Sequence, residues 1–247
     1  SSLSGLSAAQ AAQLGAGHTI YVIGAKHNPN VAAELAAFNQ RFGLPTCTTL
    51  AIPTTTKLPL AAAPTTGCQL SVAYSTAAGA LTSTVPAYEV GWATEMALDV
   101  QWAHATAPLA RIILVEASDA SLNNLLGAIQ LANAMGPGVV SMSFGSLEGS
   151  WTASADSAFT TANMTYLAAT GDSGAAVSWP AVSSKVVAVG GTSSITGPLL
   201  AALLLGIADV AGKYYIPKLG AFIVYSLMII ILVWRPQGLF VRKGGKA

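Results

Sequence analysis

Two carboxylic acids, Glu95 and Asp99, are the residues whose types and spacing could most directly do chemistry. They stand four residues apart in segment 89–107, whose apolar residues recur at helical spacing, so both carboxylates share one helix face. In a desolvated pair the second ionisation is disfavoured by the first, and the pair holds a proton. The pattern predicts a general base, Glu95, whose pKa is tuned by Asp99. The alternative is an acidic helix face in solvent, against which the flanking Trp92 and Trp102 argue.

A third acid, Asp172, lies in the turn Gly171-Asp172-Ser173-Gly174, directly after a predicted strand. A carboxylic acid held protonated there could donate a hydrogen bond to a developing oxyanion. Many ordinary turns also carry Asp and Ser beside Gly, so this motif by itself is weak evidence.

The elements that must position these acids alternate along the chain. Apolar, β-branched runs predict strands at residues 18–24, 111–117, 139–144, 165–169 and 185–189. Helical periodicity predicts helices at residues 31–42, 89–107, 122–135 and 153–163. This alternation predicts an α/β fold with a parallel sheet and helices on both faces, in which chemistry gathers beyond the carboxyl ends of the strands. The Thr-, Ala- and Pro-rich segment 45–86 is expected to be loop and edge strand.

Charge divides the chain into two unlike pieces. Up to Gly197 there are five Lys and Arg against nine Asp and Glu, whereas six bases and one acid follow. The sequence therefore predicts an α/β domain over residues 1–196 and a separate tail over 197–247. The low charge of the first piece suits an acidic exterior, although an ordinary secreted or periplasmic protein would look the same. It has no basic stripe with interleaved aromatics, which argues against nucleic acid as a partner.

The only two cysteines, Cys47 and Cys68, bracket the loop-like segment. An exported protein would oxidise them to a disulfide, which predicts Cα atoms within about 7 Å of each other. Two separate buried thiols are the alternative. The chain shows no metal-like His spacing, so no metal site is predicted.

Several ordered motifs resemble the sedolisins, subtilisin-fold peptidases that use a glutamate in place of the usual histidine base. They span about residues 15–194 and comprise Trp92, Glu95, Asp99 and Trp102, then Ser141-Met142-Ser143-Phe144-Gly145, then Gly171-Asp172-Ser173-Gly174-Ala175, and finally residues 186–192. The resemblance implies that Glu95 is the base, Asp99 its partner and Asp172 the oxyanion donor. It also implies that the strand with Ser141 and Ser143, together with Gly145, lines the substrate cleft.

The resemblance stops before the family's nucleophilic serine and its calcium site. Ser193, in Gly191-Thr192-Ser193, superficially imitates the nucleophile segment, but it sits where the family has a non-catalytic strand end. We therefore expect Ser193 not to be the nucleophile, the subtilisin-like sheet to be incomplete, and this chain to hold no calcium or other cofactor.

The tail has a different character. Residues 219–234 form an apolar run of 16 residues between Lys218 and Arg235, marginal for one transmembrane helix, and residues 199–207 are also apolar. A buried core helix is the soluble alternative. The ending Arg235-Pro236-Gln237-Gly238-Leu239-Phe240 resembles the C-terminal end of branched-chain amino-acid transporter permeases, which implies a chimera joined near residues 194–198.

The resemblance to sedolisins implies a serine-carboxyl endopeptidase-like domain that acts on peptides or proteins at acidic pH, and the missing nucleophile segment predicts that it is inactive as it stands. A non-catalytic, membrane-anchored or permease-derived chain is the alternative. The peptidase-like domain is expected outside the cytoplasm, with the tail associated with a lipid bilayer.

Overall fold

The computed structural model describes residues 5–172 and 176–190. These described residues fall into two units, one comprising residues 5–169 and 179–189, and the other residues 170–172, 176–178 and 190. The predicted tail, its permease-like ending and Ser193 lie outside the described residues. Within the described part, none of the helices has the length and apolar character needed to cross a bilayer.

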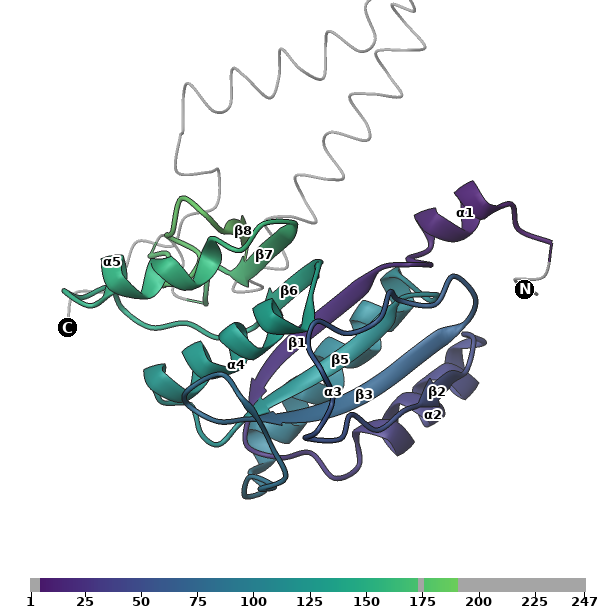
Figure 1. Cartoon of the computed structure of the whole chain (residues 1–247), viewed down its shortest axis with the longest axis horizontal. Helices are drawn as coiled ribbons and strands as arrows, with labels where there is room; N and C mark the ends of the chain where they lie inside the picture. Colours follow the sequence, from purple (N-terminus) through teal and green to yellow (C-terminus); the bar gives the residue numbers. More distant parts are fainter. Residues whose placement is uncertain (1–4, 173–175, 191–247) are drawn as a thin grey trace, which may run out of the picture. The chain divides into compact units, whose positions relative to one another are not determined.

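A mostly parallel sheet organises the first unit (Figure 1). Its strand order is β2-β3-β5-β1-β6-β7-β8, with the short β4 antiparallel to β3. The strands are β1 (Thr19–Ala25), β2 (Cys47–Thr49), β3 (Cys68–Ser75), β4 (Leu81–Thr82), β5 (Arg111–Ala117), β6 (Gly138–Met142), β7 (Met164–Ala169) and β8 (Val187–Val189). The helices are α1 (Ala8–Gln13), α2 (Val31–Phe42), α3 (Val90–Thr106), α4 (Leu122–Met135) and α5 (Thr152–Ala155), which runs into a 3₁₀ turn (Asp156–Phe159).

Helices cover both faces of the sheet, as predicted, because alternate residues of the central strands point to opposite sides. On one face Val22, Ile112 and Leu114 pack with residues of α2 and α3. On the other, Ile23 and Val115 belong to a larger core with α4. The central strands read as continuous apolar runs because both faces are buried.

Helix α3 forms where the periodicity predicts it. Glu89 caps its N-terminus, its carboxylate accepting hydrogen bonds from the backbone N–H groups of Gly91 and Trp92. Met96 and Val100 bury one stripe of the helix against the sheet. Gly24 in β1 permits this approach, since a Cβ there would lie 2.6 Å from the Met96 Sδ.

Two expectations for the elements are corrected. Segment 45–86 contains β3, which is not loop or edge but an eight-residue strand between β2 and β5. Its alternating burial explains how the polar Gln69 and Tyr74 are accommodated. The predicted helix 153–163 is wrong in length, because α5 and its 3₁₀ turn end at Phe159. Within that turn, the Asp156 carboxylate accepts hydrogen bonds from the Trp179 indole and the Ser183 hydroxyl.

The disulfide prediction is confirmed. Cys47 and Cys68 are bonded, with Cα atoms 4.5 Å apart. They are direct partners in the register of β2 and β3, so the bridge joins two paired strands at the sheet edge.

Candidate active site

Asp99 and Ser143 form the contact around which the candidate site is built. The Ser143 hydroxyl donates a 2.8 Å hydrogen bond to Asp99 Oδ1. Ser143 directly follows β6, while Asp99 lies on α3, 44 residues earlier. The bond brings the acidic face of α3 to the carboxyl end of β6, where parallel sheets collect chemistry.

Burial controls how Asp99 titrates. Loss of water raises the pKa of Asp99 to about 6; the Ser143 hydrogen bond lowers it, and the negative charge of Glu95 raises it. Glu95 is itself half-buried, one helical turn before Asp99. The two acids therefore share a half-buried helix face, and Asp99 keeps its proton into weakly acidic solution.

The tryptophans do not shield this pair as predicted. Trp102 is 62% exposed, and Leu98 beside it is 47% exposed. Trp92 is only half-buried and packs against the core. The desolvation of Asp99 therefore arises on the side that faces Ser143 and the sheet.

The other cleft residues predicted from the sequence lie in β6 or shortly after its end. Ser141 is half-buried in β6, paired with Val22 of β1 and Leu167 of β7. Gly145 is exposed just beyond the strand. Their role in holding substrate stays a prediction.

Asp172 lies in the second unit, in the exposed turn that follows β7 in the chain. Gly171 takes a left-handed conformation with φ of 91°, and the Ser178 N–H closes the turn by donating to the Thr170 carbonyl at 3.0 Å. The role of Asp172 as oxyanion donor, which the resemblance implies, stays a prediction.

A second buried acid, Glu116, was missed in the sequence. It is 0% exposed near the end of β5, and its Oε2 lies 2.6 Å from His27 Nδ1. Burial raises the pKa of Glu116, whereas hydrogen bonds from Asn28 and His27 lower it. The sequence feature that could have indicated this site is the single acidic residue within an apolar strand. Its partner His27, however, lies 89 residues away in the sequence.

This cluster supports the start of α3. The Asn28 N–H donates to Glu116 Oε1 at 3.0 Å, and the Asn28 side-chain amide donates to the Ala93 carbonyl at 3.0 Å. Ala93 is two residues before Glu95, so the buried Glu116 indirectly fixes the turn of helix that carries the acidic pair.

The comparisons with known proteins identify the family of the chain. Residues 72–208 match the Subtilase family, which is more than half of the chain and includes α3, β6 and β7. The chain belongs to the subtilase family. The match runs past residue 196, where the charge pattern predicts the first domain to end. No curated protein sequence matches the chain.

Among solved structures, this subtilase-family chain is similar to Pseudomonas sedolisin, a serine-carboxyl proteinase complexed with two molecules of pseudo-iodotyrostatin. The TM-score is 0.53 at 21% identity, over 72% of this chain and 49% of that one. The chain thus spans about half the length of that structure. The likeness supports the subtilisin-like parallel-sheet fold of the subtilase domain.

Proposed function

We propose that this subtilase-family domain is built for peptide-bond hydrolysis at acidic pH, with Glu95 as general base and Asp99 as the residue that tunes it. The observation that carries the proposal is the Ser143–Asp99 hydrogen bond, which ties the acidic pair to the end of β6. General-base catalysis works best when the pKa of the catalytic group lies near the operating pH. The pKa of Asp99, about 6, keeps a proton on the Glu95–Asp99 pair in acidic solution.

In this proposal Asp172 donates to the oxyanion, while Ser141, Ser143 and Gly145 lie beside the substrate. Peptides or proteins are the substrates, as in the family, and the domain acts outside the cytoplasm. The resemblance to sedolisins supports these roles residue by residue, and the glycine turn around Asp172 suits a hydrogen-bond donor.

Hydrolysis also needs a serine within about 3 Å of the base. The one Gly-Thr-Ser segment after Asp172 carries Ser193, which matches a strand end and not the nucleophile segment of the sedolisins. We therefore propose that the chain of 247 residues binds peptide without efficient turnover. Loss of the nucleophile in a comparable triad leaves at most roughly 10³ to 10⁴-fold over water.

The test is an assay of the full chain at acidic pH with pepstatin present, which silences aspartic proteases. We expect a long peptide to bind saturably and to stay intact, and Glu95→Gln to change the pH dependence of binding. Turnover that disappears in both Glu95→Gln and Ser193→Ala would make Ser193 the nucleophile and refute the proposed inactivity. Absence of both binding and cleavage would refute the peptidase-domain proposal itself.

A further inference from the structure

The disulfide lies against a buried histidine. His104, on α3, is 0% exposed, and its Nδ1 lies 3.3 Å from Cys47 Sγ. The donor atoms of Cys47, Cys68 and His104 all lie within 4.8 Å of one another. This cluster is separate from the acidic pair and plays no part in the proposed hydrolysis.

The hydrogen bonding of His104 fixes which nitrogen is available. His104 Nε2 lies 2.8 Å from the Pro45 carbonyl, which can only accept, so Nε2 carries the proton. Nδ1 therefore presents its lone pair toward the sulfur. A histidine that binds a metal is usually oriented in this way, with its second nitrogen donating to a backbone carbonyl.

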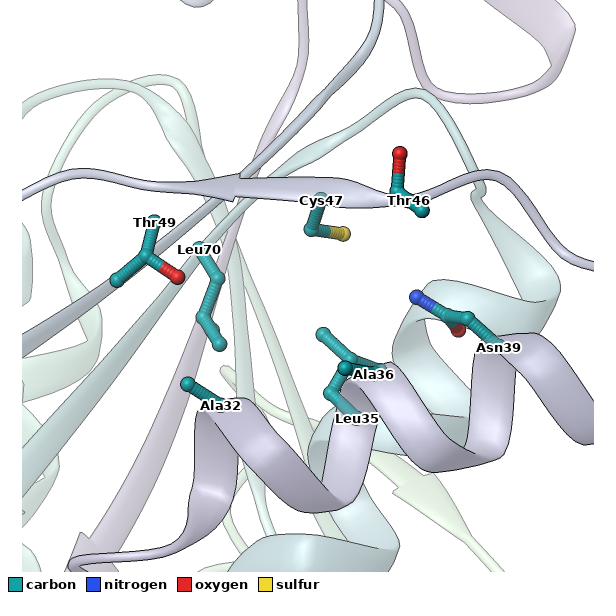
Figure 2. A pocket seen from close by; sticks show the side chains of 8 residues that line it. All are labelled: Ala32, Leu35, Ala36, Asn39, Thr46, Cys47, Thr49 and Leu70. Atoms are coloured by element: carbon teal, nitrogen blue, oxygen red, sulfur yellow. The ribbon is translucent and has the colours of Figure 1, made fainter.

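A small cavity adjoins Cys47. It has a volume of about 40 Å³ and is lined by residues of α2, β2 and β3. Figure 2 shows the Cys47 sulfur and the Asn39 side chain turned toward each other across it, with the Asn39 amide nitrogen, not Oδ1, on the side of the sulfur. Asn39 is 2% exposed, and its Oδ1 has no hydrogen-bond partner among the described residues. The cavity exceeds the space one water needs, so a polar fourth ligand fits there.

We propose that, once the disulfide is reduced, Cys47, Cys68 and His104 form a binding site for Zn²⁺, with water or, once its amide has turned over, Asn39 Oδ1 as the fourth ligand. Zn²⁺ binds thiolate at about 2.3 Å and imidazole at about 2.0 Å, which places two sulfurs about 3.8 Å apart and sulfur and nitrogen about 3.5 Å apart in a tetrahedron. The cysteines sit on paired strands with Cα atoms 4.5 Å apart, so side-chain rotation alone can separate the sulfurs to this distance.

The site forms in two steps, reduction of the disulfide and binding of the metal. A phosphine reductant gives two electrons to the disulfide and becomes a phosphine oxide with the oxygen of water, whose two protons go to the sulfurs. Zn²⁺ then binds both thiolates and His104 Nδ1, and the two thiol protons are released. Cys47 is half-buried, which leaves the reductant a route to the bond. In the oxidised chain the site has one imidazole and no thiolate, so Zn²⁺ can bind there only after reduction.

The experiment uses the full chain, reduced with a phosphine, freed of it by gel filtration without oxygen, and titrated with Co²⁺ as a spectroscopic probe for Zn²⁺. We expect one Co²⁺ per chain, a thiolate-to-cobalt charge-transfer band, and the intense visible bands of tetrahedral coordination, all displaced by Zn²⁺. The oxidised chain should give none of these bands.

His104→Gln keeps a polar side chain of similar size and should weaken Zn²⁺ binding on the order of 100-fold. His18→Gln, at a histidine that contacts the Ala16 carbonyl, is the matched control and should bind as the parent does. Equal Co²⁺ spectra for His104→Gln and the parent, or no charge-transfer band in the reduced parent, would overturn the proposal.

X-ray absorption of the Zn²⁺-loaded parent keeps the proposal testable if His104→Gln does not fold. Two sulfurs and one imidazole nitrogen in the first shell are expected. A shell of oxygen and nitrogen without sulfur, or of sulfur alone, would refute the site.

Discussion

Helices α3 and α4 pack on opposite faces of the same sheet, yet they use their residues differently. Helix α4, of 14 residues, buries half of them: Leu125, Gly127, Ala128, Ile129, Leu131, Ala132 and Met135. Helix α3 is longer, with 17 residues, but buries only Ala93, Met96, Val100 and His104. Helix α3 leaves Leu98 and Trp102 exposed and carries Glu95 and Asp99 half-buried.

The pKa values of the aspartates associated with the two helices are also shifted in opposite directions. Asp119, half-buried just before α4, accepts hydrogen bonds from the Asn124 amide and the Ser121 N–H, which lower its pKa to about 2. Burial raises the pKa of Asp99 to about 6. Helix α4 is therefore devoted to packing, whereas α3 gives up packing to hold acids in a low-dielectric setting.

The largest effect should come from the packing helix. Leu131→Ala removes a 0% exposed side chain and should lower the free energy of unfolding by about 2 to 5 kcal/mol at every pH. Leu98→Ala on α3, where the side chain is 47% exposed, should cost less than about 0.5 kcal/mol. Urea unfolding at pH 4 and pH 8 measures both, and equal costs would remove the contrast between the helices.

A pH-dependent effect should come from Asp99→Asn. Because the folded pKa of Asp99 is raised from 3.8 to about 6, folding favours its protonated form. Its contribution to stability is therefore complete below about pH 4 and is lost as pH rises through 6. Asp99→Asn should be more stable than the parent by up to about 3 kcal/mol at pH 8 and nearly equal to it at pH 4.

Asp119→Asn is the matched control for the direction of the stability change at pH 8. The lowered pKa of Asp119 makes its contribution present above about pH 4 and lost as pH falls through 2, so this variant should be less stable than the parent at pH 8. Stability changes of the same sign in the two variants at pH 8 would contradict the account.

The smallest effect should come from Ser143→Ala. It removes the hydroxyl that donates to Asp99, so the pKa of Asp99 should rise further above about 6. Thr94→Ala removes an exposed hydroxyl of α3 that donates to the Val90 carbonyl, and should leave the pKa of Asp99 unchanged. Carboxyl NMR titration of each variant decides the outcome, and a lower pKa in Ser143→Ala would count against the hydrogen bond.

Much of this fold could be predicted from local sequence. The central strands and α3 follow from apolar runs and helical periodicity, because both are decided within a few residues. Strand β3 was missed because Gln69 and Tyr74 lie at half-buried positions, and Ser71 and Ser75 at buried ones, that only the neighbouring elements create. The disulfide was predictable because only two cysteines exist.

The site was less accessible to prediction. The spacing of Glu95 and Asp99 indicated a shared face, but not the contact that desolvates it, because Ser143 lies 44 residues away. The Glu116–His27 pair and the approach of His104 to the disulfide likewise join segments that are distant in sequence. Contacts of this kind depend on the order of strands in the sheet, which local patterns leave open.

The most direct test of the central claim is the titration of the Asp99 side-chain carboxyl carbon, followed by NMR in the intact chain. We expect a midpoint at about pH 6, and a lower midpoint in Glu95→Gln, where the neighbouring negative charge is gone. A midpoint near the ordinary value of 3.8 in the parent would mean that α3 carries a solvated acidic face and not a desolvated acid pair.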